Sequence, residues 1–121
     1  VISIFKERLE NGKPITIYGD GETTRDFVYV ADVVESLISA AEANDGVHVY
    51  NIGTGEEISL QKLVATLEKA LSITADVAYK DERVGDIKRS VASIEKAHRE
   101  LDWQPKVTFE EGIVQLVKKS Q

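Results

Sequence analysis

The chain has 121 residues, 42% of them hydrophobic and 30% charged, which is ordinary for one globular domain or a piece of one. Its net charge of −6 argues against general nucleic-acid binding, and the absence of cysteine excludes disulfides and thiolate zinc sites. There is no apolar run of the ~20 residues that a membrane span needs and no signal peptide, so we expect no membrane partner and a cytoplasmic location.

The first predicted element is a helix over residues 1–11, with Ile2, Phe5 and Leu9 on one face and Gly12 at its end. Because the chain opens in the middle of this apolar pattern, we expect it to be a fragment of a longer protein. A short strand is predicted at residues 15–18.

Arg25 lies between two predicted strands. Gly19, Asp20 and Gly21 form a turn before it, and residues 27–30 are rich in aromatic and β-branched side chains, which predicts a second strand. This order suits a loop that presents one cation to a ligand. A surface hairpin with a solvated arginine is the alternative.

A second helix is predicted over residues 31–43, opened by Asp32 and Glu35 as a capping box and ended by Asn44-Asp45-Gly46. Along it, an apolar stripe at helical spacing consists of Val33, Val34, Leu37, Ile38 and Ala41. A strand over residues 47–52 and a turn at Gly53-Thr54-Gly55 follow.

The remaining elements repeat the alternation of strand and helix. Ser59 is predicted to cap a third helix, residues 75–79 to form a strand, residues 81–89 a charged loop, and Ser93 to cap a short helix. Trp103 is expected to cover the core, and Thr108 with Glu111 is expected to open a last helix as a capping box. The alternation predicts an α/β fold.

Four ordered stretches carry a resemblance that covers nearly the whole chain. They are Ile17-Tyr18-Gly19-Asp20-Gly21 with Arg25-Asp26-Phe27, then Tyr50-Asn51-Ile52-Gly53, Arg83-Val84-Gly85-Asp86 and Leu101-Asp102-Trp103-Gln104-Pro105. Together they resemble the C-terminal part of the extended short-chain dehydrogenases that act on nucleotide sugars. The resemblance implies a small mixed α/β substrate-binding domain plus the last strand and helix of a Rossmann domain.

The resemblance also implies six substrate-binding residues: Arg25, Arg83, Asp86, Thr16, Tyr18 and Asn51. In the family the two arginines contact the nucleotide's phosphates, and two guanidinium groups suit a diphosphate. The aspartate would accept hydrogen bonds from the ribose hydroxyls, the two residues at positions 16 and 18 would hold the pyrimidine base, and the asparagine would approach the phosphates.

Each assignment has a structural alternative. Arg83 and Asp86 could form a surface ion pair, Tyr18 could lie in the core, and Asn51 could satisfy a local turn. The family commonly has proline at the position of Val84, so this loop is expected to be looser.

The catalytic parts of the resembled enzymes are not found in this sequence. There, NAD binds to a glycine-rich turn of an N-terminal Rossmann domain, and a Tyr-x-x-x-Lys pair transfers the proton. None of the four tyrosines has lysine four residues later, and the glycine pattern at Gly53 and Gly55 is not completed. We therefore assign no catalytic or cofactor-binding residue and expect the fragment alone to be inactive. His48 and His98 are too far apart in sequence to suggest a metal site.

The leading expectation is thus residues 1–121 as the nucleotide-sugar-binding fragment of an NAD-dependent enzyme, with UDP-glucose 4-epimerase as the parent activity. A dTDP-glucose 4,6-dehydratase or UDP-glucuronate decarboxylase parent, a non-catalytic binding module and an interaction domain remain alternatives. NAD is expected in the intact parent and no cofactor in the fragment. Without the N-terminal Rossmann domain, a strand edge and apolar helix faces are expected to be uncovered, which predicts self-association.

Overall fold

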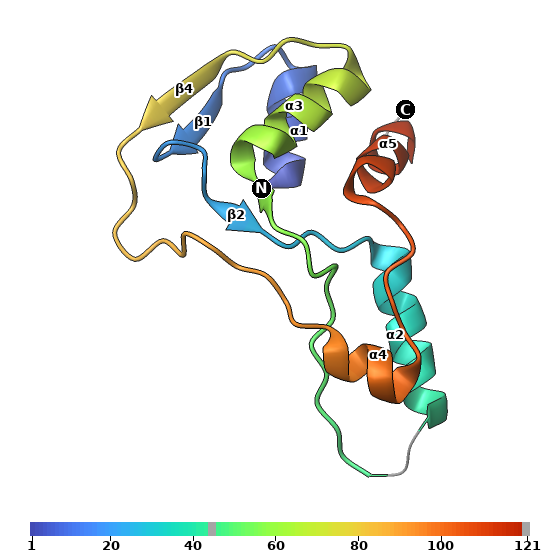
Figure 1. The fold of residues 1–121 in the computed structure, drawn as a ribbon. Coiled ribbons are helices and arrows are strands. Elements are labelled where there is room, and N and C mark those ends of the chain that lie inside the picture. The colour runs from blue at the N-terminus through green and yellow to red at the C-terminus, as the bar shows by residue number, and fades with distance from the viewer. Residues whose placement is uncertain (44–45, 120–121) are drawn as a thin grey trace.

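The computed structural model describes residues 1–43 and 46–119 (Figure 1). Its elements in chain order are α1 (Ile2–Glu10), β1 (Ile15–Tyr18), β2 (Thr24–Arg25), α2 (Val30–Ala43), β3 (Ile58–Ser59), α3 (Leu60–Leu71), β4 (Val77–Lys80), α4 (Glu95–Leu101) and α5 (Phe109–Lys119). β1 pairs with β4 in parallel, and β2 pairs with β3 antiparallel. The mixed α/β class is therefore confirmed.

The main core lies where α1, α3 and α5 meet β1. Ile15 and Ile17 of β1 are fully buried against Leu63 and Leu67 of α3, whereas Thr16 and Tyr18 are half-buried on the alternate positions of the strand. This is the period of two that a half-covered strand requires. The buried side of the strand fixes it in place and leaves its other side chains for contacts outside the core.

A second, smaller cluster lies at the other end of the molecule, where α2 and α4 pack together (Figure 1). Ala97 and Leu101 of α4 pack there with Trp103, which is 3% exposed. The Trp103 indole donates a hydrogen bond of 3.0 Å to the backbone oxygen of Asp32. The expectation that Trp103 covers a core is confirmed for this second cluster.

Two of the four predicted helix caps are confirmed. The Ser59 hydroxyl accepts from the Lys62 amide at 3.1 Å and opens α3. Thr108 and Glu111 form the reciprocal capping box of α5, with distances of 2.9 and 3.2 Å. Both caps are local, so sequence spacing alone determines them.

The other two predicted caps are wrong. α4 begins after Ile94, not Ser93, and no side chain caps it. α2 begins at Val30, so Asp32 lies inside its first turn rather than at the cap. The Asp32 carboxylate is buried and accepts from the Val107 amide at 3.1 Å, which fastens α2 to the segment before α5. Glu35 forms an ion pair with Lys106 instead of a capping bond.

Two predicted strands are also wrong. Residues 27–29 are irregular, and the strand at this place is the two-residue β2, because only Thr24 and Arg25 find a partner in β3. Residues 47–52 form no strand, since no described strand lies beside them. Val47 and Val49 of this segment are 97% and 77% exposed. In the predicted turn at Asn44-Asp45-Gly46, positions 44 and 45 lie outside the described residues.

The apolar stripe of α2 faces outward. Val34, Leu37 and Ile38 are 49%, 66% and 53% exposed, whereas Asp32 and Ser36 are buried. The reason is that α4 and Trp103 contact the opposite side of the helix, where Asp32 holds two hydrogen bonds. An exposed stripe of this kind is the uncovered helix face expected from the sequence.

Candidate functional site

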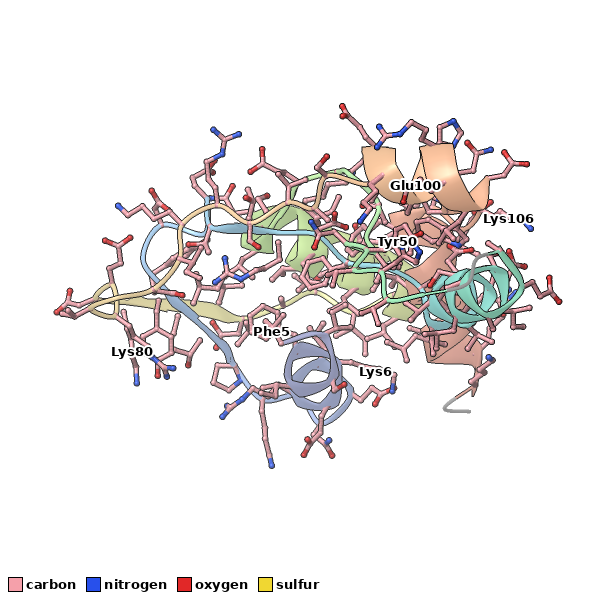
Figure 2. The ribbon with its side chains drawn as sticks, turned by 90° about the horizontal axis from the view of Figure 1, so that it is seen from below. Phe5, Lys6, Tyr50, Lys80, Glu100 and Lys106 are labelled. Atoms are coloured by element: carbon pink, nitrogen blue, oxygen red, sulfur yellow. The ribbon has the colours of Figure 1, made fainter. Side chains whose placement is uncertain are left out.

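A groove of about 480 Å³ lies between α1 and the open edge of β1. In Figure 2, Phe5 lies on the side of α1 that faces the strands, and Lys80 lies at the end of β4. The groove is lined by Val1, Ile4, Phe5, Arg8, Thr16, Ile17, Tyr18, Leu60, Lys80, Arg83 and Asp86. Four of the six predicted substrate-binding residues therefore line one cavity.

β1 presents main-chain groups to this groove. The Ile15 amide donates to the Asp76 oxygen at 2.7 Å, and the Gly19 amide donates to the Lys80 oxygen at 2.8 Å. The odd-numbered residues of the strand thus bond to β4. Because neighbouring peptide groups of a strand point in opposite directions, those of Thr16 and Tyr18 point to the free edge. This edge offers both donors and acceptors to a flat polar ligand.

Arg83 stacks on Tyr18. The guanidinium carbon lies 3.8 Å from the centre of the phenol ring, a close cation–π contact. Hydrogen bonding and the charge of Arg83, in that order, lower the pKa of Tyr18 below its usual value. Burial acts in the opposite direction and is outweighed. Tyr18 is therefore not a core residue, and its ring stacks against the Arg83 guanidinium at the wall of the groove.

Arg25 and Asp86 form an ion pair with a distance of 3.1 Å between Nη2 and Oδ1. Arg25 Nη1 also donates to the backbone oxygens of Thr24, at 2.7 Å, and Ile87, at 2.6 Å. The arginine thus ties the 86–87 loop to β2 and orients the Asp86 carboxylate. About a third of each side chain is exposed, and Asp86 lines the groove whereas Arg25 lies behind it.

Asp26, the next residue, is not among the six predicted substrate-binding residues. Its carboxylate accepts four hydrogen bonds: from the Thr54 amide at 2.8 Å, the Thr54 hydroxyl at 2.6 Å, the Gly55 amide at 3.0 Å and the Ala92 amide at 3.2 Å. Burial raises the pKa of Asp26, but these hydrogen bonds outweigh it and hold the pKa below its usual value. Asp26 joins three segments that are distant in sequence.

The glycine turn at residues 53–55 is closed by this carboxylate. A Cβ on Gly53 would lie 2.6 Å from Asp26 Oδ2 and 2.7 Å from the Ala92 side chain, so only glycine fits there. Since the amides of Thr54 and Gly55 already donate to Asp26, they are not available to cradle a phosphate. The similarity of Gly53 and Gly55 to a phosphate-binding pair is therefore not matched by the geometry.

Asn51 is separated from the other predicted site residues. It lines a second cavity of about 450 Å³ together with Asp26, Tyr50 and the segment 90–93. Among the described residues, none lines both this cavity and the groove. The structure thus brings Arg83, Asp86, Thr16 and Tyr18 together, attaches Arg25 through Asp86, and places Asn51 elsewhere.

Two further cations line the groove without having been predicted. Arg8 donates from Nη1 to the Pro14 oxygen at 3.0 Å, and Lys80 stands in register with Tyr18 across the β1–β4 pair. No sequence motif contains them, because their shared place depends on how α1 packs beside the strands. Within residues 1–43 and 46–119 there is no group of three potential metal ligands, and no helix is long and apolar enough to cross a membrane.

Comparisons with known proteins cover nearly all of the chain. A family model described as GDP-mannose 4,6 dehydratase matches residues 1–116. The dTDP-4-dehydro-6-deoxyglucose reductase of Escherichia coli is 35% identical over 98% of this chain and 37% of its own length. The crystal structure of a UDP-glucose 4-epimerase from Thermotoga maritima with UDP-glucose is 38% identical, with a TM-score of 0.89 over 98% of this chain and 39% of its own.

A second solved UDP-glucose 4-epimerase, from Thermus thermophilus in complex with NAD, is 37% identical with a TM-score of 0.86. The alignment covers 97% of this chain and 38% of that one. The chain therefore spans less than two fifths of each of these three proteins.

Proposed function

This chain belongs to the family of nucleotide-sugar epimerases and dehydratases that use NAD, and on that basis we propose that it is the nucleotide-sugar-binding portion of such an enzyme. The proposed reaction of the whole enzyme is UDP-glucose 4-epimerisation. Similarity to two UDP-glucose 4-epimerases over almost the full chain supports this choice.

The observation that carries the proposal is the groove in which Tyr18, Arg83 and Asp86 meet the free edge of β1. A pyrimidine base is flat and has both donors and acceptors on its edge, so it suits the peptide groups of Thr16 and Tyr18 with the phenol ring alongside. A carboxylate only accepts hydrogen bonds, so Asp86 suits a ribose diol. A diphosphate would lie between these groups and the guanidinium of Arg83.

The charges of the groove support an anionic ligand. The protein carries −6 overall, yet Arg8, Lys80 and Arg83 all line this cavity. Among the described residues that line it, Asp86 is the one carboxylate, and Arg25 pairs with it. A local excess of positive charge in an acidic protein attracts phosphates to this place.

Arg25 is proposed to act in two ways. It orients Asp86 and the 86–87 loop, and it keeps guanidinium N–H groups near the position proposed for the diphosphate. Asn51 is proposed to touch the ligand only if that ligand extends into the second cavity, which Asp26, the residue after Arg25, also lines.

The chemistry of the whole enzyme is proposed to need residues beyond these. The amides of the 53–55 turn are taken by Asp26, so the residues present do not fit a dinucleotide's phosphates. The sequence also holds no Tyr-x-x-x-Lys pair. We therefore expect this chain to bind nucleotide sugars without turning them over, with NAD held by an N-terminal Rossmann domain of the parent enzyme.

The test is calorimetric titration of the chain with UDP and with dTDP. We expect binding that Arg83→Ala and Arg25→Ala both weaken, because each removes a cation from the groove or its support. Arg99→Ala on α4 is the matched control, since this arginine lines no cavity described above and should bind like the unaltered chain. Binding unaffected by either groove variant would contradict the site, and tighter binding of dTDP would favour a dTDP-sugar enzyme.

A further inference from the structure

Arg8 and Lys80 are the two groove cations that the proposed contacts with ribose and diphosphate do not use. Both line the cavity beside Tyr18, one from α1 and one from the end of β4. Tyr18 and Lys80 are register partners in the β1–β4 pair, so their side chains emerge on the same side of the strands. Arg8 is held by its bond to the Pro14 oxygen, so its charge keeps a defined place.

These cations are available to a ligand. No carboxylate among residues 1–43 and 46–119 forms an ion pair with either of them. Both side chains belong to exposed residues, and the positive charges of both act on the Tyr18 hydroxyl, where they add to the effect of Arg83. The Tyr18 end of the groove is therefore a place where positive charge meets an open strand edge.

Positive charge beside the strand edge can distinguish pyrimidine bases by the group they carry at ring position 4. Uracil and thymine carry a keto oxygen at ring position 4, which accepts hydrogen bonds, whereas cytosine carries an amino group there, which only donates. A cation attracts the oxygen and gives a charge-assisted hydrogen bond, but it opposes the N–H dipoles of the amino group.

We propose that Arg8 and Lys80 are specificity-determining residues that make the groove select nucleotides with a 4-keto pyrimidine over those with a 4-amino pyrimidine. This inference rests on the proposed function, because it places the base at Tyr18. It goes beyond it in naming two side chains that read the base, in addition to the main chain of β1.

UDP and CDP are the appropriate probes, because they share the ribose and the diphosphate and differ only in the base. A cation that merely attracts the diphosphate raises the affinity for both nucleotides by the same factor. A cation that reads position 4 changes the ratio of the two affinities. The ratio therefore separates specificity from general electrostatic attraction.

The experiment is calorimetric titration with UDP and CDP of the unaltered chain, Arg8→Gln, Lys80→Gln and the double variant. Lys69→Gln on α3 is the matched control, because it removes the same charge from an exposed residue that lines no described cavity. Circular dichroism confirms that each variant is folded.

We expect UDP to bind roughly tenfold more tightly than CDP, which is near the lower end of the discrimination that a good hydrogen-bonded contact to a base edge gives. Each single variant should reduce that ratio, the double variant should bring it close to one, and Lys69→Gln should leave it unchanged. Lys80→Glu should shift the ratio toward CDP, because a carboxylate accepts from the amino group.

Equal affinities for UDP and CDP in the unaltered chain, or an unchanged ratio in the double variant, would overturn this inference and leave the proposed function intact. Binding of neither nucleotide by the folded chain would instead overturn the proposed site, and the inference with it.

Discussion

Asp26→Asn is the most informative single substitution in this protein. The side chain keeps its size, but one carboxylate oxygen becomes an NH₂ group that can only donate. In the native protein, Oδ1 accepts from the amide and hydroxyl of Thr54, and Oδ2 accepts from the amides of Gly55 and Ala92. Whichever way the asparagine turns, its NH₂ group faces at least one backbone N–H that has lost its acceptor.

The magnitude follows from this geometry. A hydrogen bond to a charged group contributes about 1.5–3 kcal/mol, and a partly buried donor left without its acceptor costs about 1–3 kcal/mol. If the asparagine takes the better orientation, the free energy of unfolding should fall by about 2–4 kcal/mol. The two native-like bonds that the remaining oxygen accepts are neutral and therefore weaker than the ones they replace.

The assay is urea denaturation of Asp26→Asn beside Asp20→Asn. Asp20 is the matched control because, among residues 1–43 and 46–119, its exposed carboxylate accepts one backbone hydrogen bond, from the Glu22 amide at 2.9 Å, which an asparagine oxygen can also accept. That variant should lie within about 0.5 kcal/mol of the unaltered chain. The reasoning would be refuted if Asp26→Asn were equally mild.

The pH dependence gives a second check on the same residue. Because the pKa of Asp26 is lower in the folded chain than its usual 3.8, its contribution to stability is complete above that value and is lost as the pH falls below it. Asp26→Asn has no such carboxylate. The difference in unfolding free energy between the two proteins should therefore shrink in acid, and a difference independent of pH would contradict the assigned hydrogen bonds.

Three further predictions concern other parts of the molecule. Glu57 accepts hydrogen bonds from Arg89 and from Thr24, which together lower its pKa to about 2. Glu57→Gln should therefore destabilise the chain at neutral pH. The difference in stability from the unaltered chain should disappear only as the pH falls from about 4.5 toward 2, as measured by thermal denaturation at each pH. Tyr18 should ionise below its usual pKa of 10.0 in an absorbance titration, and Arg83→Gln should move its pKa back up; no movement would contradict the stacked guanidinium. We also propose that the exposed stripe of α2 drives self-association, so Leu37→Glu should lower the average mass by light scattering at high concentration, and a monodisperse monomer before substitution would refute this.

The parts of the fold that depend on neighbouring residues could be predicted from the sequence. Ser59 opens α3 and Thr108 with Glu111 opens α5 because each cap is complete within four residues. Asp32 has the same cap-forming chemistry, but its carboxylate bonds to Val107, which is 75 positions away. A capping rule that considers only neighbouring residues cannot predict a competing hydrogen-bond partner so far away in sequence.

The outward stripe of α2 has a similar cause. Helical periodicity identifies an apolar face, but it does not say which element covers that face. In this chain α4 and Trp103 pack against the opposite side of α2, where Asp32 accepts hydrogen bonds from Trp103 and Val107.

The site residues that belong to sequence motifs could be predicted, whereas those brought to the site only by packing could not. Tyr18 and Arg83 are 65 positions apart, and resemblance to a family was what suggested that they act on one ligand; the structure stacks them at 3.8 Å. Asp26 could have been suspected from its place beside Arg25. Arg8 and Lys80 belong to no motif, because only the packing of α1 beside β1 brings them to the groove.

The order in which this groove assembles during folding follows from the parallel pairing of β1 with β4. Tyr18 meets Lys80 only after the intervening 61 residues have been closed into a loop, whereas α3 and α5 can begin to form around their own caps. We therefore expect the groove walls, which come from both strands and from residues 83–86, to be completed late in folding. A nucleotide that bridges them would be bound after the rate-limiting step, so it would slow unfolding and leave the folding rate nearly unchanged.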